Sequence, residues 1–262
     1  MELNHEEFER QALEIIDAAE KNGITLRLLG AVAFRIHCPE HRDLQASMHR
    51  VLTDIDFAAY YKHEKAIDKL FLNDLGYESQ TAALTPGLML GRKIYYDTTD
   101  ERAHVDIFFD KLNMCHVVSW QKGRLDIDKP TISLADLMLE KLQIVQINEK
   151  DVKDVMMLLR EHEIGDSDHE VVNGDYISKI MARDWGFYYT STTNLNKIKS
   201  LLGEYDALSP DARDLISARI DELLVMIEKE PKSLGWKLRS KVGTKKQWYN
   251  DVEEVERAEH LI

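Results

Sequence analysis

An acidic, strand-like segment near the start of the chain constrains its fold more than any other feature. Residues 52–57 read Leu-Thr-Asp-Ile-Asp-Phe, so polar and apolar side chains alternate with the period of a β-strand. This period places Asp54 and Asp56 on one face, with Ile55 and Phe57 packed into a core behind them. We therefore expect a sheet in which one strand presents two carboxylates on the same face.

A third carboxylate is expected to approach the first two. Asp106 lies in the run 104–108, His-Val-Asp-Ile-Phe, which has the composition of a second strand. If the two strands converge, three carboxylates meet at one edge of the sheet. Such a cluster is poorly tolerated without cations, and carboxylates together with substrate phosphates commonly hold Mg²⁺. The pattern indicates a divalent-cation site.

The Asp-x-Asp spacing alone is weak evidence, because it recurs at 126–128 and 166–168. Those pairs lie beside glycine or proline and are typical of solvated connections. The first pair differs because apolar residues flank it, a turn at Gly30 precedes it, and Asp106 lies on another apolar strand. From the residues alone, a cation site and a merely solvated strand face both remain open.

Composition limits the class of protein. The chain has 262 residues, 44% hydrophobic and 31% charged, which is typical of an ordinary globular protein. It contains no apolar run long enough to cross a bilayer, and its first seven residues are acidic where a signal peptide would be basic. We expect a cytoplasmic protein without a membrane partner. The net charge of -13 disfavours a broad polyanion-binding surface but leaves a local patch open.

The predicted architecture is α+β, with a mixed sheet and flanking helices in residues 1–130 and a helical C-terminal domain in residues 131–262. Gly30 and Pro39 bound a short helix, while 38–50 and the basic segment 232–246 are expected to be irregular. The expected strands are 26–29 and 54–60, with further strands between 77 and 110 joined by turns at 86–87 and 97–100; the expected helices are 6–19, 31–37, 63–75, 134–145, 149–161 and 210–229.

A series of motifs in this order resembles the nucleotidyltransferase superfamily, which shares its fold with the polymerase-β palm. Gly30-Ala31 follows a strand, and the acidic strands follow with Asp54-Ile55-Asp56 and then Asp106. The helical segments 139–143 and 150–154 are similar to the Lys-Leu and Arg/Lys-Asp-x-x-Asp motifs of the AbiEii-like (type IV toxin-like) branch. Aminoglycoside and lincosamide nucleotidyltransferases are similar around residues 52–57. The resemblance covers roughly residues 24 to 160.

The resemblance implies transfer of a nucleoside monophosphate, with AMP from ATP the expected case, onto a hydroxyl group, with Mg²⁺ or Mn²⁺ as cofactor. From the residues alone, Lys141 is equally consistent with a contact to the triphosphate and with a lysine at a domain seam. For Asp151 and Asp154, a solvated helix face is the favoured explanation. The implied nucleotide-binding residues are Gly30, Ala31, Lys141 and Asp154, and the implied catalytic and metal-binding residues are Asp54, Asp56 and Asp106.

The chain departs from the family pattern at Ala31, where relatives usually have glycine or serine, and in the long interval between Gly30 and Asp54. Three hypotheses for function follow: an enzyme acting on an NTP and a small-molecule acceptor, a toxin-type enzyme acting on tRNA or protein, and a catalytically weak nucleotide-binding module. The basic segment, with Trp236 and Trp248 near its ends, would favour an RNA acceptor if the tryptophans stacked on bases. The alternative, which we favour, is that both tryptophans pack on the helical core.

Overall fold

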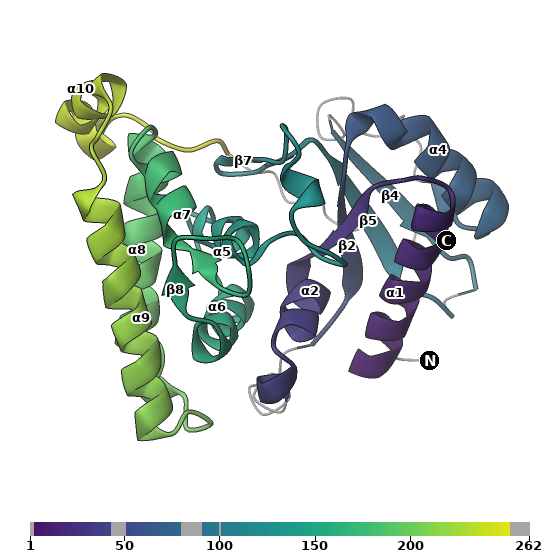
Figure 1. Ribbon diagram of the computed structural model, residues 1–262, viewed down its shortest axis with the longest axis horizontal. Helices are drawn as coiled ribbons and strands as arrows, with labels where there is room; N and C mark the ends of the chain where they lie inside the picture. Colours follow the sequence, from purple (N-terminus) through teal and green to yellow (C-terminus); the bar gives the residue numbers. More distant parts are fainter. Residues whose placement is uncertain (1–2, 43–50, 80–90, 100, 252–262) are drawn as a thin grey trace.

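The computed structural model describes residues 3–42, 51–79, 91–99 and 101–251 (Figure 1). The protein is α+β, with a mixed five-stranded sheet in its N-terminal part and a mostly helical C-terminal region, as the sequence predicts. The strands are β1 Leu26–Leu29, β2 Asp54–Ala59, β3 Glu78–Ser79, β4 Arg92–Tyr96, β5 His104–Phe109, β6 Lys111–Asn113, β7 Val117–Ser119, β8 Ile164–Gly165 and β9 Val172–Asn173. The α-helices are α1 His5–Lys21, α2 Gly30–His37, α4 Glu64–Lys69, α5 Leu134–Leu142, α6 Glu149–Glu161, α7 Gly174–Met181, α8 Trp185–Leu201, α9 Pro210–Lys229 and α10 Leu234–Val242.

The two acidic strands are neighbours in the middle of the sheet. The strand order is β1-β2-β5-β4-β3, and β2 pairs with β5 in parallel while the other pairings are antiparallel. In this register Asp56 lies opposite Asp106, and Asp54 lies opposite His104. The parallel pairing is what places the acidic residues of both strands at the same end of the sheet.

The two faces of the sheet have opposite chemistry. Ile55 and Val105 lie opposite each other and share a face with Tyr95, and all three side chains are fully buried. Helix α4 covers this face, where Asp68 accepts a hydrogen bond of 2.7 Å from the Tyr95 hydroxyl. The acidic side chains lie on the opposite face, because successive residues of a strand alternate between faces.

Helices of the C-terminal part pack directly against the sheet domain. Helix α2 contacts both α5 and α6, which places it between the sheet and the helical region (Figure 1). Thr131 forms a bridge to Leu28, and buried apolar residues from both parts form one continuous cluster. The proposed division into domains 1–130 and 131–262 stays a prediction.

Local signals in the sequence account for the starts of several helices. Ser133 caps α5 by accepting from the Asp136 N–H, Asn148 caps α6 by accepting from the Asp151 N–H, and Ser209 caps α9 ahead of Pro210. The helices predicted at 149–161 and 210–229 are confirmed residue for residue. No described helix is both long enough and apolar enough to span a bilayer.

Some predicted boundaries are wrong. The strand 54–60 ends at Ala59, the helix 134–145 ends at Leu142, and the helix 63–75 is divided into α4 and a π-helical turn, Leu70–Asp74. The loop 38–50 begins with a 3₁₀ turn, Pro39–His41, and its residues 43–50 lie outside the described residues, as does the turn at 86–87.

The basic segment 232–246, expected to be irregular, contains helix α10. Ser233 caps this helix by accepting from the Trp236 N–H, and Gly235 lies inside it, so the prediction of irregular backbone is wrong for Leu234–Val242. Glycine weakens a helix by only about 1 kcal/mol relative to alanine. The cap and the packing of Trp236 on α8 outweigh this cost.

Candidate metal centre

Three carboxylates converge at one end of the central strands. Asp54 and Asp56 on β2 and Asp106 on β5 each offer an oxygen, and these oxygens lie within 4.8 Å of one another. The Thr53 hydroxyl donates a hydrogen bond of 3.0 Å to Asp54 Oδ1. The predicted convergence is confirmed, and the three residues form a possible metal site.

The electrostatics of this cluster disfavour three ionised carboxylates in the absence of a cation. Burial is the main cause that raises the pKa of Asp56 well above its ordinary value, and the neighbouring charges of Asp54, Asp106 and Glu140 raise it further. Lys141 acts in the opposite direction. A divalent cation would remove the repulsion that raises this pKa, which is why such clusters are candidate cation sites.

Gly30 allows the chain to pass directly beside the acidic cluster. It is the first residue of α2, has a φ of +68°, and would place a Cβ atom in collision with Asp56 Oδ2. Its left-handed backbone favours glycine, and a side chain here would displace the Asp56 carboxylate. The turn after β1 is therefore adapted to the Asp56 carboxylate.

The backbone amide of Gly30 already holds an anionic group. It donates a hydrogen bond of 3.1 Å to Oε2 of Glu140, a buried residue of α5 that lies 110 positions away in the chain. The N-terminus of a helix favours negative charge, because its N–H groups lack partners within the helix. Binding of a phosphate oxygen to this amide, as the family resemblance implies, would require Glu140 to move away from it.

Lys141 lies at the centre of a buried charge network. Its Nζ is 3.1 Å from Glu140, 3.1 Å from Asp151 and 3.3 Å from Asp154, and only 8% of its side chain is exposed. Asp151 and Asp154 are themselves buried, so the solvated-face alternative for them was wrong. Burial raises the pKa of Glu140, while the charge of Lys141 counteracts this rise. The predicted contact of Lys141 and Asp154 with nucleotide stays a prediction.

Arg92, at the start of β4, connects the cluster to the next strand. Its Nη2 forms an ion pair and hydrogen bond with Oδ2 of Asp106, and its guanidinium lies 5.2 Å from the Phe108 ring centre. Its Nε is buried and has no hydrogen-bond partner within the described part of the chain. Arg92 thus occupies one of the carboxylate oxygens that a cation at Asp106 would use.

The donor set fits a hard divalent cation. All three residues offer carboxylate oxygens, which suit Mg²⁺ and Mn²⁺ rather than the softer metals that prefer thiolate or imidazole. Another group of possible ligands, Glu40, His41 and Glu161, has a simpler explanation. Glu161 accepts hydrogen bonds from the backbone amides of Glu40 and His41 and contacts the His41 ring, so it stabilises the 3₁₀ turn.

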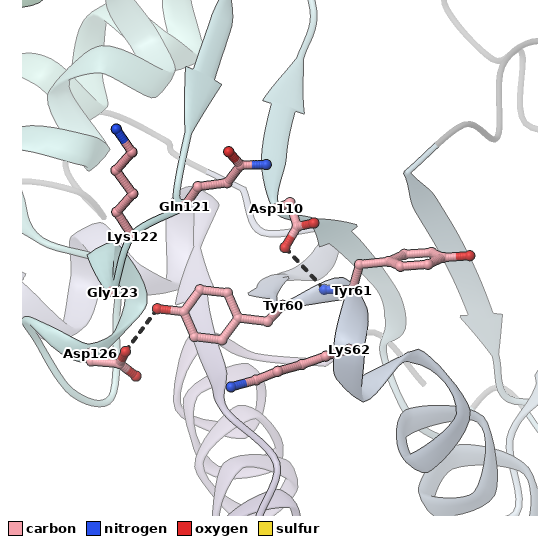
Figure 2. A pocket seen from close by; sticks show the side chains of 8 residues that line it. All are labelled: Tyr60, Tyr61, Lys62, Asp110, Gln121, Lys122, Gly123 and Asp126. Carbon is pink, nitrogen blue, oxygen red and sulfur yellow. Dashed lines mark hydrogen bonds between the residues drawn. The ribbon is translucent and has the colours of Figure 1, made fainter.

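A separate open pocket of about 500 Å³ lies at the other end of β2 (Figure 2). It surrounds Tyr60 and Tyr61, beyond the end of the strand that carries Asp54 and Asp56 near its start. Its two aspartates are engaged, because Asp126 accepts from the Tyr60 hydroxyl and Asp110 accepts from the Tyr61 amide (Figure 2). We therefore place the candidate site at the carboxylate cluster.

Ala31, His104 and the aromatic run 185–189 also have defined positions in the fold. Ala31 is the second residue of α2 and partly buried, and His104 is exposed at the start of β5. The aromatic run 185–189 belongs to α8 and packs against aromatic side chains outside it: Tyr188 contacts Trp236, and Tyr189 contacts Trp248. It therefore forms part of the packed helical region.

Sequence reasoning missed Glu140 and Arg92. Two consecutive charged residues, Glu140 and Lys141, in a helix that is otherwise apolar except for Asp136 were a usable signal, because both had to be buried if the helix was. Arg92 had no comparable signal, since its pairing with Asp106 depends on the antiparallel register of β4 and β5.

Comparisons with models of known protein families, with known proteins and with solved structures found no significant match to this chain. The resemblance to nucleotidyltransferases therefore depends on the motifs and on the geometry described above.

Proposed function

We propose that this protein is a Mg²⁺-dependent nucleotidyltransferase that moves a nucleoside monophosphate from an NTP, with ATP the expected donor, to a hydroxyl group of a small molecule. The observation that carries the proposal is the convergence of Asp54, Asp56 and Asp106, whose oxygens lie within 4.8 Å of one another. The turn at Gly30, which brings the backbone directly beside Asp56 and favours glycine, supports it. Mn²⁺ would serve in place of Mg²⁺ because it prefers the same oxygen ligands.

The three carboxylates would have different roles in the transfer reaction. Asp54 and Asp56 would hold the cation, which when bound neutralises charge on the phosphate oxygens. Asp106 would complete the cation site and accept a proton from the acceptor hydroxyl. The acceptor oxygen would form a bond to the α-phosphorus while the bond to the bridging oxygen breaks, and pyrophosphate would leave with the electron pair.

Transfer of label is the direct test. The protein is incubated with Mg²⁺ and each of the four NTPs labelled at the α-phosphate, together with a cell extract that is then separated into RNA, protein and small molecules. We expect label from one NTP to enter the small-molecule fraction. A variant in which Asp54 and Asp56 are both replaced by asparagine should give none.

Label in the RNA or protein fraction would favour the toxin-type alternative over an enzyme with a small-molecule acceptor. If no NTP gives transfer but Mg²⁺-dependent NTP binding is intact, the hypothesis of a catalytically weak nucleotide-binding module is favoured. Ala31 is the best argument for that hypothesis. Absence of both binding and transfer would contradict the proposal.

Arg92→Gln is expected to raise the affinity for Mn²⁺ about two- to fivefold in the absence of nucleotide, because it removes an ion pair that competes for Asp106. Electron paramagnetic resonance of free Mn²⁺ during a titration measures this affinity directly. Arg92→Lys keeps the charge and should change the affinity less. A Mn²⁺ affinity that is unchanged or lower in Arg92→Gln would mean that Asp106 is not a ligand.

The toxin-type alternative draws on one observation, the basic character of the segment around α10. The tryptophans of this segment are engaged elsewhere, because Trp236 packs edge-on against Tyr188 and Trp248 against Tyr189. Trp248 also donates a hydrogen bond of 3.0 Å to Thr190. Both rings already pack on α8, which favours the small-molecule acceptor.

A further inference from the structure

The segment 231–250, here called the basic arm, differs in charge from the rest of the chain. The basic arm contains six positively charged residues and no aspartate or glutamate. Because the net charge of the whole chain is -13, the net charge of the remainder is -19. These charges belong to Lys232, Lys237, Arg239, Lys241, Lys245 and Lys246.

Helix α10 of the basic arm carries an exposed apolar stripe. Leu234, Leu238 and Val242 lie four residues apart on one side of the helix and are 74%, 57% and 42% exposed. Leu234 is more exposed than any other large hydrophobic side chain in the described ranges. Lys237 and Lys241 are exposed beside this stripe. The outer surface of α10 is therefore apolar along its centre and positive along one border.

The basic arm is fixed in place by its inner side. Ser233 N–H donates to Ala182 O, Trp236 packs on Tyr188, and Asn250 N–H donates to Cys115 O. Arg239 faces inward: its guanidinium lies 4.8 Å from the Trp185 ring centre and donates to the backbone oxygens of Gly243, Lys246 and Gln247. The exposed stripe is thus presented by a helix whose other side is already anchored.

We propose that the outer surface of α10 binds an acidic amphipathic helix of a partner protein. The apolar stripe extends over about 12 Å, since its ends are eight residues apart at about 1.5 Å per residue, and this length matches two turns of a partner helix. Acidic residues beside the partner's apolar side chains would pair with Lys237 and Lys241. This proposal is independent of the chemistry at the carboxylate cluster.

Charge and shape disfavour other occupants. A nucleic acid would use the lysines but not three aliphatic side chains, and the neighbouring tryptophans are packed on α8. A second copy paired through the same helix would bring Lys237 and Lys241 against their own equivalents.

The test uses the full chain and a fluorescent, acidic peptide helix of about four turns, with leucines four residues apart flanked by glutamates. Anisotropy titrations should show saturable binding that weakens as salt is added. A peptide with serine in place of its leucines should bind at least tenfold more weakly. Leu234→Ser with Leu238→Ser, and separately Lys237→Gln with Lys241→Gln, should each weaken binding of the leucine peptide at least tenfold.

Matched control variants distinguish binding at the surface of α10 from general effects of losing exposed leucines or lysines. Leu13→Ser with Leu72→Ser removes two exposed leucines elsewhere, and Lys65→Gln with Lys69→Gln removes two exposed lysines of α4; neither pair should change binding. Circular dichroism should show that all four double variants remain folded, as expected for exposed positions.

Four outcomes would overturn the proposal. The first is the absence of saturable peptide binding, and the second is equal binding of the leucine and serine peptides. The third is tighter binding of tRNA, or of vesicles containing equal parts of phosphatidylglycerol and phosphatidylcholine, that the α10 variants abolish. The fourth is a dimer in sedimentation experiments that Leu234→Ser with Leu238→Ser dissociates.

Discussion

Replacing Asp54 and Asp56 together by asparagine should abolish the rise in Tm that Mg²⁺ or Mn²⁺ with an NTP produces in the unaltered protein. A ligand at 100 times its Kd stabilises the folded state by about 2.7 kcal/mol, which corresponds to roughly 5–10 °C for a chain of this size. Asparagine keeps the shape of aspartate but loses the charge that holds a cation. Differential scanning fluorimetry with and without metal and nucleotide measures the effect.

The same variant should be more stable than the unaltered protein when no cation is present. The pKa of Asp56 is raised in the folded state above its ordinary value of 3.8, so the folded protein holds this proton more tightly than the unfolded chain. The stability that Asp56 contributes is complete below about pH 3.8 and is lost as the pH rises through the raised pKa. Asparagine does not titrate, so its advantage should grow over this range and persist at neutral pH.

A suitable control replaces Asp206 and Asp214, two exposed aspartates of the helical region, by asparagine. It removes the same charge without touching the cluster and should leave the metal-dependent shift intact. A metal-dependent shift that survives in the Asp54 and Asp56 variant would show that the cation binds elsewhere.

Lys141→Met is expected to destabilise the protein even without nucleotide. Removing one member of a buried ion network leaves its partners uncompensated, and such changes cost about 3–5 kcal/mol. Here the partners are Glu140, Asp151 and Asp154, each within 3.3 Å of the Lys141 Nζ. Methionine fills similar volume, so the loss would report charge rather than a cavity. Chemical unfolding by urea at neutral pH measures it.

The loss in Lys141→Met should shrink as the pH is lowered, because Lys141 no longer counteracts the burial that raises the pKa of Glu140, and this carboxyl group then takes up a proton in the folded state. Lys199→Met removes a surface pair with Asp221 and should cost no more than about 1 kcal/mol at any pH. If Lys141→Met instead keeps its stability but loses affinity for the NTP, the main role of Lys141 would be to contact the triphosphate.

Local patterns in the sequence were sufficient to predict the acidic face. The alternation around Asp54 and Asp56 has the period of a strand, and a strand with buried Ile55 and Phe57 must turn the aspartates to the other face. Capping residues such as Ser133 and Ser209 predict helix starts for the same reason, because each acts within one turn of its own position.

Only the tertiary structure decided which charged groups meet. Glu140 reaches the amide of Gly30 from 110 residues away, and Arg92 reaches Asp106 through the pairing of β4 with β5. Neither contact can be predicted from hydrophobic periodicity. That periodicity shows which face of a helix or strand is buried, but not which element packs against it. The same distinction applies to α10. Its N-terminal cap is a local feature of the sequence, but the exposure of Leu234 depends on which side of the helix packs against the aromatic residues of α8.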